Sequence, residues 1–166
     1  MTKHLFLIRH ARTAERAVDM KDIDRPLTLE GIQNASKMGR FFLLKNISPD
    51  SIMSSTALRA KTSAELMAEQ MNYDTAKIYM SDKIYEASAR TLLQIVNAIK
   101  EEFKTVLLIG HNPSISFLAE YITGEEIGDV TNCGVIRIKC KNISWEEIDS
   151  GNGELADYYY PEIISI

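Results

Sequence analysis

The sequence predicts a three-layer α/β fold in which a mostly parallel central sheet is flanked by helices. Short apolar segments alternate along the chain with stretches in which apolar residues recur every three or four positions, which is typical of alternating strands and helices. Two apolar segments, residues 5–8 and 106–109, are uninterrupted, as in strands buried on both faces of a sheet. A chain of 166 residues has the length of one domain, so we expect a single domain over residues 1–166.

The first half of the chain begins with the apolar strand at residues 5–8 and continues with a charged, aperiodic loop at 11–26. Thr28 is a suitable N-cap for an amphipathic helix that ends near Leu44, because its hydroxyl can accept from the free N–H groups of the first turn. The elements expected next are a short strand at 51–54, a helix capped by Thr56 that ends near Met71, and a weaker strand at 76–80.

The second half of the chain is expected to continue this alternation and then to change. A helix at 89–103 precedes the strand at 105–109, and a helix that starts at Asn112 or Ser114 ends near Gly124. Residues 135–140 alternate apolar and basic side chains, as in a strand with one exposed face. The segments that follow, 144–149 and 154–160, are separated by Ser-Gly-Asn-Gly and predict a terminal hairpin of antiparallel edge strands.

The composition excludes several classes of protein. The chain carries 19 Lys and Arg against 23 Asp and Glu, a formal charge of −4, which argues against a nucleic-acid partner. No apolar run reaches the ~18 residues of a membrane span, and the N-terminal run is shorter than the ~7 residues of a signal peptide. Cys133 and Cys140 have the spacing of neither a disulfide framework nor a zinc site. We therefore expect a cytoplasmic protein without a membrane, nucleic-acid or metal partner.

Two histidines follow the two buried strands directly. His10 comes after the strand at 5–8 and His111 after the strand at 106–109, and the chain has only 3 histidines. Ligands of open α/β sheets bind beyond the carboxyl ends of the strands. If these two strands are parallel neighbours, both histidines lie at that edge, although either one taken alone could be an incidental loop residue.

Arginines accompany the histidines. Arg9 precedes His10, and Arg59 falls in the first turn of the expected second helix, where free N–H groups also favour an anion. The forked guanidinium group suits the oxygens of a phosphate. Two arginines and two histidines at one sheet edge need an anion between them, so the sequence predicts a phosphate-binding site.

Four segments in this order resemble the histidine phosphatase superfamily. They are Leu-Ile-Arg-His-Ala at 7–11, Arg-Pro-Leu-Thr at 25–28, Ser-Ser-Thr-Ala-Leu-Arg-Ala at 54–60 and Gly-His-Asn-Pro at 110–113. The small size and the short loop before Arg25 resemble the SixA-type phosphohistidine phosphatase branch, which implies a phosphoglycerate mutase-like fold. Ala11 departs from the usual Arg-His-Gly, and a methyl group is tolerable there unless the backbone needs a positive φ.

The resemblance implies a two-step phosphoryl transfer that needs neither metal nor cofactor. A neutral His10 would attack phosphorus and form a phosphohistidine that water then hydrolyses. Arg9, Arg59 and His111 would hold the three equatorial oxygens, and His111 would act best as a cation. The chain also lacks the glycine-rich motifs that bind nucleotide cofactors.

The general acid and the further substrate contacts are assigned from the same resemblance. Larger relatives carry a carboxylate after the third strand, and Glu86 is the residue here that best matches it. Glu86 could equally be a plain surface glutamate, in which case Asp22 and Asp24 are the alternatives. The expected additional substrate contacts are Thr13, Arg25 and Asn112, although Arg25 could instead form an ion pair with Asp22 or Asp24.

The expected activity is hydrolysis of phosphohistidine on a protein such as a histidine-containing phosphotransfer domain. The loop at 11–24 is short, and a short loop leaves an open, shallow site that suits a side chain protruding from a folded protein. Two alternatives remain at this point: a phosphatase for small phosphoesters, and a phosphate-binding module without turnover. The second alternative would be expected to lack the nucleophile, whereas His10 is present.

Overall fold

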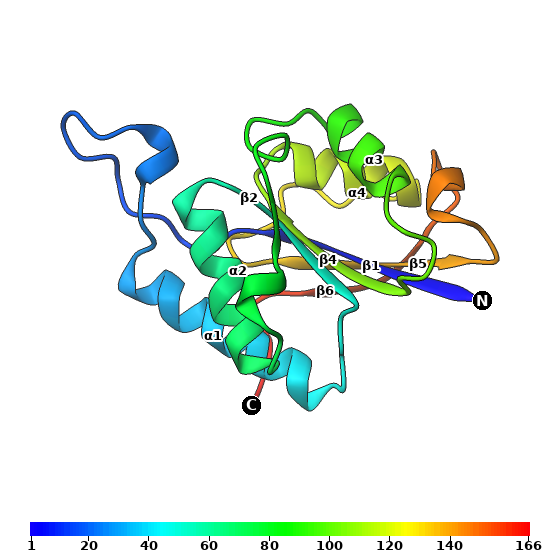
Figure 1. The fold of residues 1–166 in the computed structure, drawn as a ribbon, viewed down its shortest axis with the longest axis horizontal. Helices are drawn as coiled ribbons and strands as arrows, with labels where there is room; N and C mark the ends of the chain where they lie inside the picture. Colours follow the sequence, from blue (N-terminus) through cyan, green and yellow to red (C-terminus); the bar gives the residue numbers. More distant parts are fainter.

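The computed structural model describes residues 1–166 and contains a six-stranded sheet with helices on both faces (Figure 1). The strand order is β3-β2-β4-β1-β5-β6, and the strands are β1 (Thr2–Arg9), β2 (Ser51–Ser55), β3 (Tyr79–Ser81), β4 (Thr105–Gly110), β5 (Val135–Lys141) and β6 (Glu154–Tyr159). Strands β1 to β4 are parallel, and β5 and β6 are antiparallel to their neighbours. The predicted three-layer α/β fold with a mostly parallel sheet is confirmed.

Alternate side chains of β1 explain why both faces of the sheet are covered. Phe6 and Ile8 belong to the apolar cluster shared with helices α1 (Leu29–Leu44) and α2 (Leu58–Gln70). Leu5 and Leu7 belong to the cluster on the other face, with α3 (Ala89–Asn97) and α4 (Ser114–Thr123). Successive side chains of a strand point to opposite faces, so an uninterrupted apolar run is what a doubly covered strand requires.

Helix α1 begins as predicted, whereas α2 does not. The Thr28 hydroxyl accepts from the Gly31 N–H at 2.9 Å, which is the predicted N-cap of α1. Thr56 does not cap α2, because its hydroxyl donates instead to the Asp82 carboxylate at 2.6 Å. The residue before α2 is Ala57, whose side chain makes no capping hydrogen bond.

Three further elements differ from the prediction. Strand β3 is shorter because Thr75–Lys77 form a 3-10 turn before it. Helix α3 ends at Asn97, whose side-chain amide donates to the backbone oxygens of Trp145 and Ile148 at 2.8 and 3.0 Å. The terminal hairpin is wrong, since Trp145–Glu147 form a 3-10 turn with a capping box and β6 pairs with β5.

The order of the strands brings the ends of β1 and β4 together. These strands are parallel neighbours with Arg9 opposite Gly110, and the His10 N–H donates to the Gly110 oxygen at 3.1 Å. His10 and His111 therefore leave the sheet at the same edge, as the sequence predicted. The loop after β1 projects beyond this edge (Figure 1).

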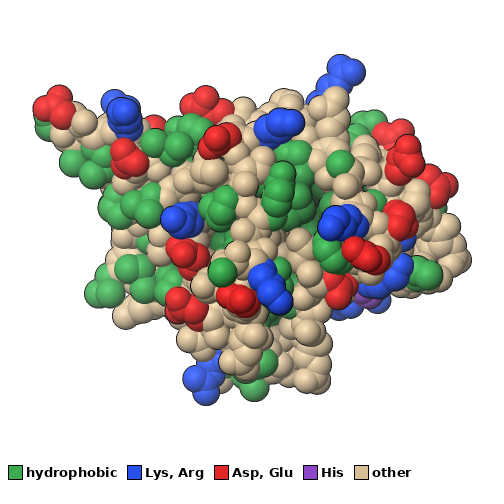
Figure 2. All heavy atoms as spheres, in the orientation of Figure 1, with side chains coloured by type: hydrophobic (Ala, Val, Ile, Leu, Met, Phe, Trp, Pro, Cys, Tyr) green, Lys and Arg blue, Asp and Glu red, His purple; other side chains and the backbone are tan.

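The surface and the helices bear on possible partners. On the face seen in Figure 2, Lys and Arg side chains are interspersed with Asp and Glu, so this face carries no continuous basic patch. None of the helices combines the length and the apolar character that crossing a membrane requires.

Candidate active site

A polar cavity of about 290 Å³ lies at the carboxyl ends of β1 and β4. Its lining residues are Arg9, His10, Thr13, Arg25, Arg59, His111, Asn112 and Asn132. The lining contains three guanidinium groups, two imidazoles and no carboxylate or hydrophobic side chain. A wall of this charge favours an oxyanion such as a phosphoryl group.

His10 has one ring nitrogen free for chemistry. The side chain is buried, and its Nδ1 lies 2.8 Å from the Ala11 carbonyl oxygen, which can only accept a hydrogen bond. This contact assigns the proton to Nδ1 and leaves the lone pair on Nε2. Burial lowers the pKa of His10 to about 3, and the charges of Arg59 and Arg9, with any proton on His111, act in the same direction. His10 is therefore a neutral imidazole at physiological pH, the state that a nucleophile needs.

Thr13 helps to hold this tautomer. Its hydroxyl lies 3.2 Å from His10 Nδ1 and donates to the Ala11 oxygen at 3.1 Å. Ala11 itself is buried, has no positive φ, and donates its N–H to the Ser63 hydroxyl at 2.9 Å. The backbone conformation at this position thus accepts a methyl group in place of the usual glycine.

His111 lies beside His10, with 5.1 Å between the ring centroids. Its Nε2 lies 2.8 Å from the Ser55 hydroxyl oxygen, while its Nδ1 is buried and has no hydrogen-bond partner. Burial and the Arg59 charge lower the pKa of His111 to about 4. The cationic form expected from the resemblance is therefore disfavoured in the protein alone. The negative charge of a bound phosphoryl group would favour it.

Two arginines are anchored and still present donors to the cavity. Arg59 donates through Nη1 to the Asp22 backbone oxygen at 2.8 Å and through Nη2 to the Asp22 carboxylate at 3.0 Å. Arg9 donates through Nη1 to the Val130 oxygen at 2.9 Å, and its buried Nε has no partner. A guanidinium group has five N–H donors, so each side chain retains donors for a ligand.

Arg25 forms the ion pair with Asp22 that was the alternative to a substrate contact, and the substrate contact itself stays a prediction. Its side chain lines the cavity, and it also pairs with Asp22 at 3.4 Å and donates to the Ala14 backbone oxygen at 3.0 and 3.1 Å. Asn112 lines the cavity with its amide fixed on both sides, since Nδ2 donates to the Val130 oxygen and Oδ1 accepts from the Ser116 hydroxyl.

The carboxylates considered as general acids do not line the cavity. Glu86 is exposed, and its backbone has a φ of 57° in the left-handed region. Asp22 accepts from the Tyr85 hydroxyl at 2.6 Å; this hydrogen bond and the contacts with Arg59 lower the pKa of Asp22 to about 2. Asp22 is therefore ionised at neutral pH and has no proton to donate. Asp24 is exposed and absent from the lining.

The structure adds residues that the sequence did not single out. Asn132 lines the cavity because β5 is antiparallel to β1 and starts where β1 ends. Ser55 holds His111, and the Tyr85 ring lies 5.7 Å from the His111 ring. The strand order would have pointed to Asn132, and Ser55 lies within the segment 54–60 although its contact with His111 was not foreseen, whereas no local pattern marks Tyr85.

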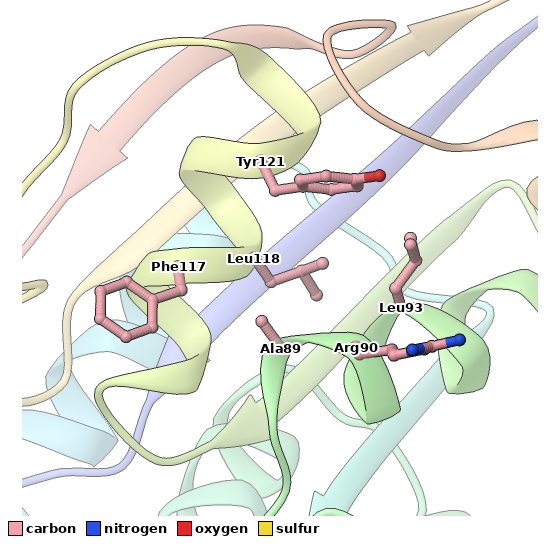
Figure 3. Close-up of a pocket in the computed structure, with 6 residues that line it drawn as sticks. All are labelled: Ala89, Arg90, Leu93, Phe117, Leu118 and Tyr121. Atoms are coloured by element: carbon pink, nitrogen blue, oxygen red, sulfur yellow. The ribbon is translucent and has the colours of Figure 1, made fainter.

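A larger cavity of about 530 Å³ lies between α3 and α4 (Figure 3). Its lining residues are Ala89, Arg90, Leu93, Phe117, Leu118 and Tyr121. Apart from Arg90 the lining is hydrophobic. It contains no histidine, carboxylate, serine or cysteine that could act as a nucleophile. Such a surface would not stabilise a phosphoryl dianion. The candidate chemistry therefore belongs to the smaller polar cavity.

The fold and the polar cavity fit the histidine phosphatases as a class, and comparison with known proteins identifies the family. The model of the histidine phosphatase superfamily (branch 1) matches residues 5–89, more than half of the chain. The chain belongs to the histidine phosphatase superfamily. The predicted SixA type is also confirmed by the solved structures that share its fold.

Two of these structures are of proteins assigned as phosphohistidine phosphatases and called SixA. The one from Agrobacterium tumefaciens is 26% identical with a TM-score of 0.82 and covers 96% of this chain and 98% of its own. The one from Nakamurella multipartitia is 22% identical with a TM-score of 0.84 and covers 97% of both chains. A mycobacterial glucosyl-3-phosphoglycerate phosphatase shares the fold at 16% identity and a TM-score of 0.67, covering 93% of this chain and 97% of its own.

Proposed function

We propose that this protein is a phosphohistidine phosphatase that removes phosphoryl groups from histidine side chains of proteins. The observation that carries the proposal is the state of His10: buried, neutral, with Nδ1–H held by the Ala11 oxygen and Nε2 free at a cavity lined by three arginines. A neutral nucleophile surrounded by cations is suited to a dianionic phosphoryl group.

The proposed reaction has two steps at phosphorus. In the first, the substrate's free ring nitrogen takes up a proton from solvent, His10 Nε2 forms a bond to phosphorus while the P–N bond of the substrate breaks, and the substrate imidazole leaves as a neutral molecule. In the second, water attacks the phosphohistidine on His10, inorganic phosphate leaves and the neutral imidazole returns. Arg9, Arg59 and His111 would share the negative charge on the equatorial oxygens in both steps.

The leaving group supports phosphohistidine as the substrate class. An alkoxide is strongly basic and needs a proton from a well-placed acid as it leaves. An imidazole whose free ring nitrogen is already protonated leaves as a neutral molecule and needs no such acid. No carboxyl group lines the cavity, and Asp22, the nearest carboxylate to Arg59, is ionised. A folded partner, such as a histidine-containing phosphotransfer domain, would present such a histidine.

A small phosphoester is the second candidate substrate. The similarity in fold to the mycobacterial glucosyl-3-phosphoglycerate phosphatase favours it, as does the polar lining beyond the phosphoryl contacts, to which Arg25 and Asn132 belong. A phosphate-binding module without turnover has no comparable support, because His10 retains the state of a nucleophile.

The decisive experiment traps the covalent intermediate. The enzyme is assayed separately with three substrates: a protein phosphorylated on histidine, p-nitrophenyl phosphate and serine phosphate. Each assay is run with and without EDTA. The reaction is then quenched at alkaline pH, and the peptides are analysed by mass spectrometry. We expect an acid-labile phosphoryl group on His10, unchanged rates with EDTA, and a kcat/KM that is highest for the histidine protein. His10→Ala should lose nearly all turnover. His4→Ala is the matched control, because His4 lies next to Arg137, whose Nη2 is 3.2 Å from its Nδ1, and is outside the cavity.

The outcomes separate the alternatives. A phosphoryl group on another residue, or an active His10→Ala variant, would contradict the nucleophile. Loss of activity with EDTA that Mg²⁺ restores would contradict a metal-independent reaction. A kcat/KM that is higher for serine phosphate than for the phosphorylated histidine protein would indicate that small phosphoesters, and not phosphohistidine, are the substrate class.

A further inference from the structure

Tyr85 contacts three groups of the candidate site without lining the cavity itself. Its hydroxyl donates to the Asp22 carboxylate at 2.6 Å. The Arg59 guanidinium carbon lies 5.9 Å from the centroid of its ring, and the His111 ring lies 5.7 Å away in an edge-to-face arrangement. The side chain thus touches both a cation and an imidazole that the proposed reaction uses, as well as the carboxylate that anchors the cation.

We propose that Tyr85 is a positioning residue for phosphoryl transfer: its hydroxyl fixes the Asp22 carboxylate, and Asp22 in turn fixes the Arg59 guanidinium group. This inference rests on the proposed use of Arg59 at the equatorial oxygens of the phosphoryl group.

The geometry between Asp22 and Arg59 gives the step from carboxylate to guanidinium. Arg59 donates two hydrogen bonds to this one residue, to its backbone oxygen at 2.8 Å and to Oδ2 at 3.0 Å, and its side chain is only 10% exposed. The Tyr85 hydroxyl meets the same Oδ2 atom. A change at that hydroxyl is therefore felt at the oxygen that orients Nη2 of Arg59.

The hydroxyl is a permanent donor. Its hydrogen bond to Asp22 raises the pKa of Tyr85 to about 12, so the proton stays on the phenol throughout the range of an assay. Asp22 is an acceptor throughout the same range because it is ionised. The contact is charge-assisted, a type of hydrogen bond that is stronger than a neutral one.

The segment after β3 contributes Tyr85 to the site and no general acid. Ile84 is buried in the apolar cluster beneath α3 and α4, which fixes the backbone beside Tyr85. Glu86 follows in the left-handed region and is exposed. The segment after β3 thus presents a tyrosine ring to His111.

The test is a double-mutant cycle between Tyr85→Phe and Arg59→Ala with p-nitrophenyl phosphate, a substrate that does not depend on phosphohistidine specificity. Tyr85→Phe keeps the ring and the net charge and removes one hydroxyl. We expect kcat to fall about tenfold with KM changed by less than about threefold, because Arg59 would bind the oxygens most strongly in the transition state. In the Arg59→Ala background the same substitution should change kcat by less than about twofold.

Tyr121→Phe is the matched control. The Tyr121 hydroxyl donates to the Asp149 carboxylate at 2.7 Å, a bond of the same kind outside the polar cavity. This variant should lower the melting temperature about as much as Tyr85→Phe and leave kcat unchanged. If Tyr85→Phe lowers only the melting temperature, or if its kinetic effect persists undiminished in the Arg59→Ala background, the inference is wrong.

Failure of the proposed function is a separate result. If the wild type hydrolyses p-nitrophenyl phosphate but prefers small phosphoesters over phosphohistidine, the substrate proposal fails and the cycle still reports on Tyr85. If the wild type hydrolyses none of these three substrates, the affinity for vanadate, measured by calorimetry, replaces kcat in the double-mutant cycle. An affinity that Tyr85→Phe weakens equally with and without Arg59 would then overturn the inference.

Discussion

Lowering the pH from 7 to 5 should reduce the free energy of unfolding by about 4 kcal/mol through His10 and His111 alone. The pKa of an unhindered histidine is 6.5, and burial lowers it to about 3 for His10 and about 4 for His111. The unfolded chain therefore binds these two protons in a range where the folded protein does not. Stability is highest above pH 6.5 and falls as the pH drops from there toward the folded values.

The magnitude follows from the two pKa values of each histidine. At pH 5 an unfolded histidine is protonated and the folded one is still neutral, which corresponds to about 2 kcal/mol per residue relative to pH 7. Asp22 adds little between pH 7 and 5. Its pKa is 3.8 in the unfolded chain and about 2 in the folded protein, so its contribution to stability is lost only as the pH falls from about 3.8 towards 2. The histidine pair therefore contributes more than Asp22 over this range, and His4, whose pKa is also lowered by burial, acts in the same direction.

The assay is urea unfolding at both pH values, with His10→Asn as the comparison. An Asn Nδ2 can replace His10 Nδ1 as a donor to the Ala11 oxygen, so this variant keeps that contact and lacks the titrating ring. It should lose only about 2 kcal/mol between the two pH values, half of the wild-type loss. NMR should show His10 with Nδ1 protonated and neutral at pH 5. A His10 pKa near 6.5, or equal losses in both proteins, would refute the reasoning.

Other substitutions test the cations, the acid and the packing. Arg9→Ala and Arg59→Ala should each lower kcat/KM by roughly 10²-fold on p-nitrophenyl phosphate, as for one lost donor at a developing charge. Glu86→Gln should slow phosphohistidine hydrolysis by less than about tenfold because Glu86 lies outside the cavity; a much larger loss would restore it as the general acid. Gly39→Ala should cost roughly 1–3 kcal/mol in urea unfolding, since its Cβ would lie 2.7 Å from the Cα and O atoms of Met67, and unchanged stability would contradict this.

The sequence predicted those features that depend on local pattern and on chain order. The apolar runs that became β1 and β4 and the residues directly after them located one edge of the sheet, because the ends of parallel neighbours coincide. The first helix was predicted with its cap, since Thr28 acts within its own turn. For these elements the governing interactions lie within a few residues of one another.

The remaining features depend on contacts between distant segments. Thr56 has the chemistry of a cap, but Asp82 competes for its hydroxyl. Residues 144–149 have a strand-like pattern, but Trp145 is wholly buried and its ring N–H donates to the Phe103 oxygen at 2.8 Å, which holds the segment as a turn. Tyr85 was not identified because its role depends on Asp22 and Arg59, which come from other elements.

The central position of β1 determines when the site can form. Strand β1 is translated well before β4 and β5, the two strands that enclose it, so its edges stay unpaired while most of the chain is synthesised. Pairings between residues this far apart in sequence are slow to close. The cavity needs residues from both sides of this strand, from Arg9 to Asn132, and is completed only when β5 has joined the sheet. A nascent or partly unfolded chain therefore has His10, the proposed nucleophile, without the rest of the cavity, and we expect activity to return late in refolding.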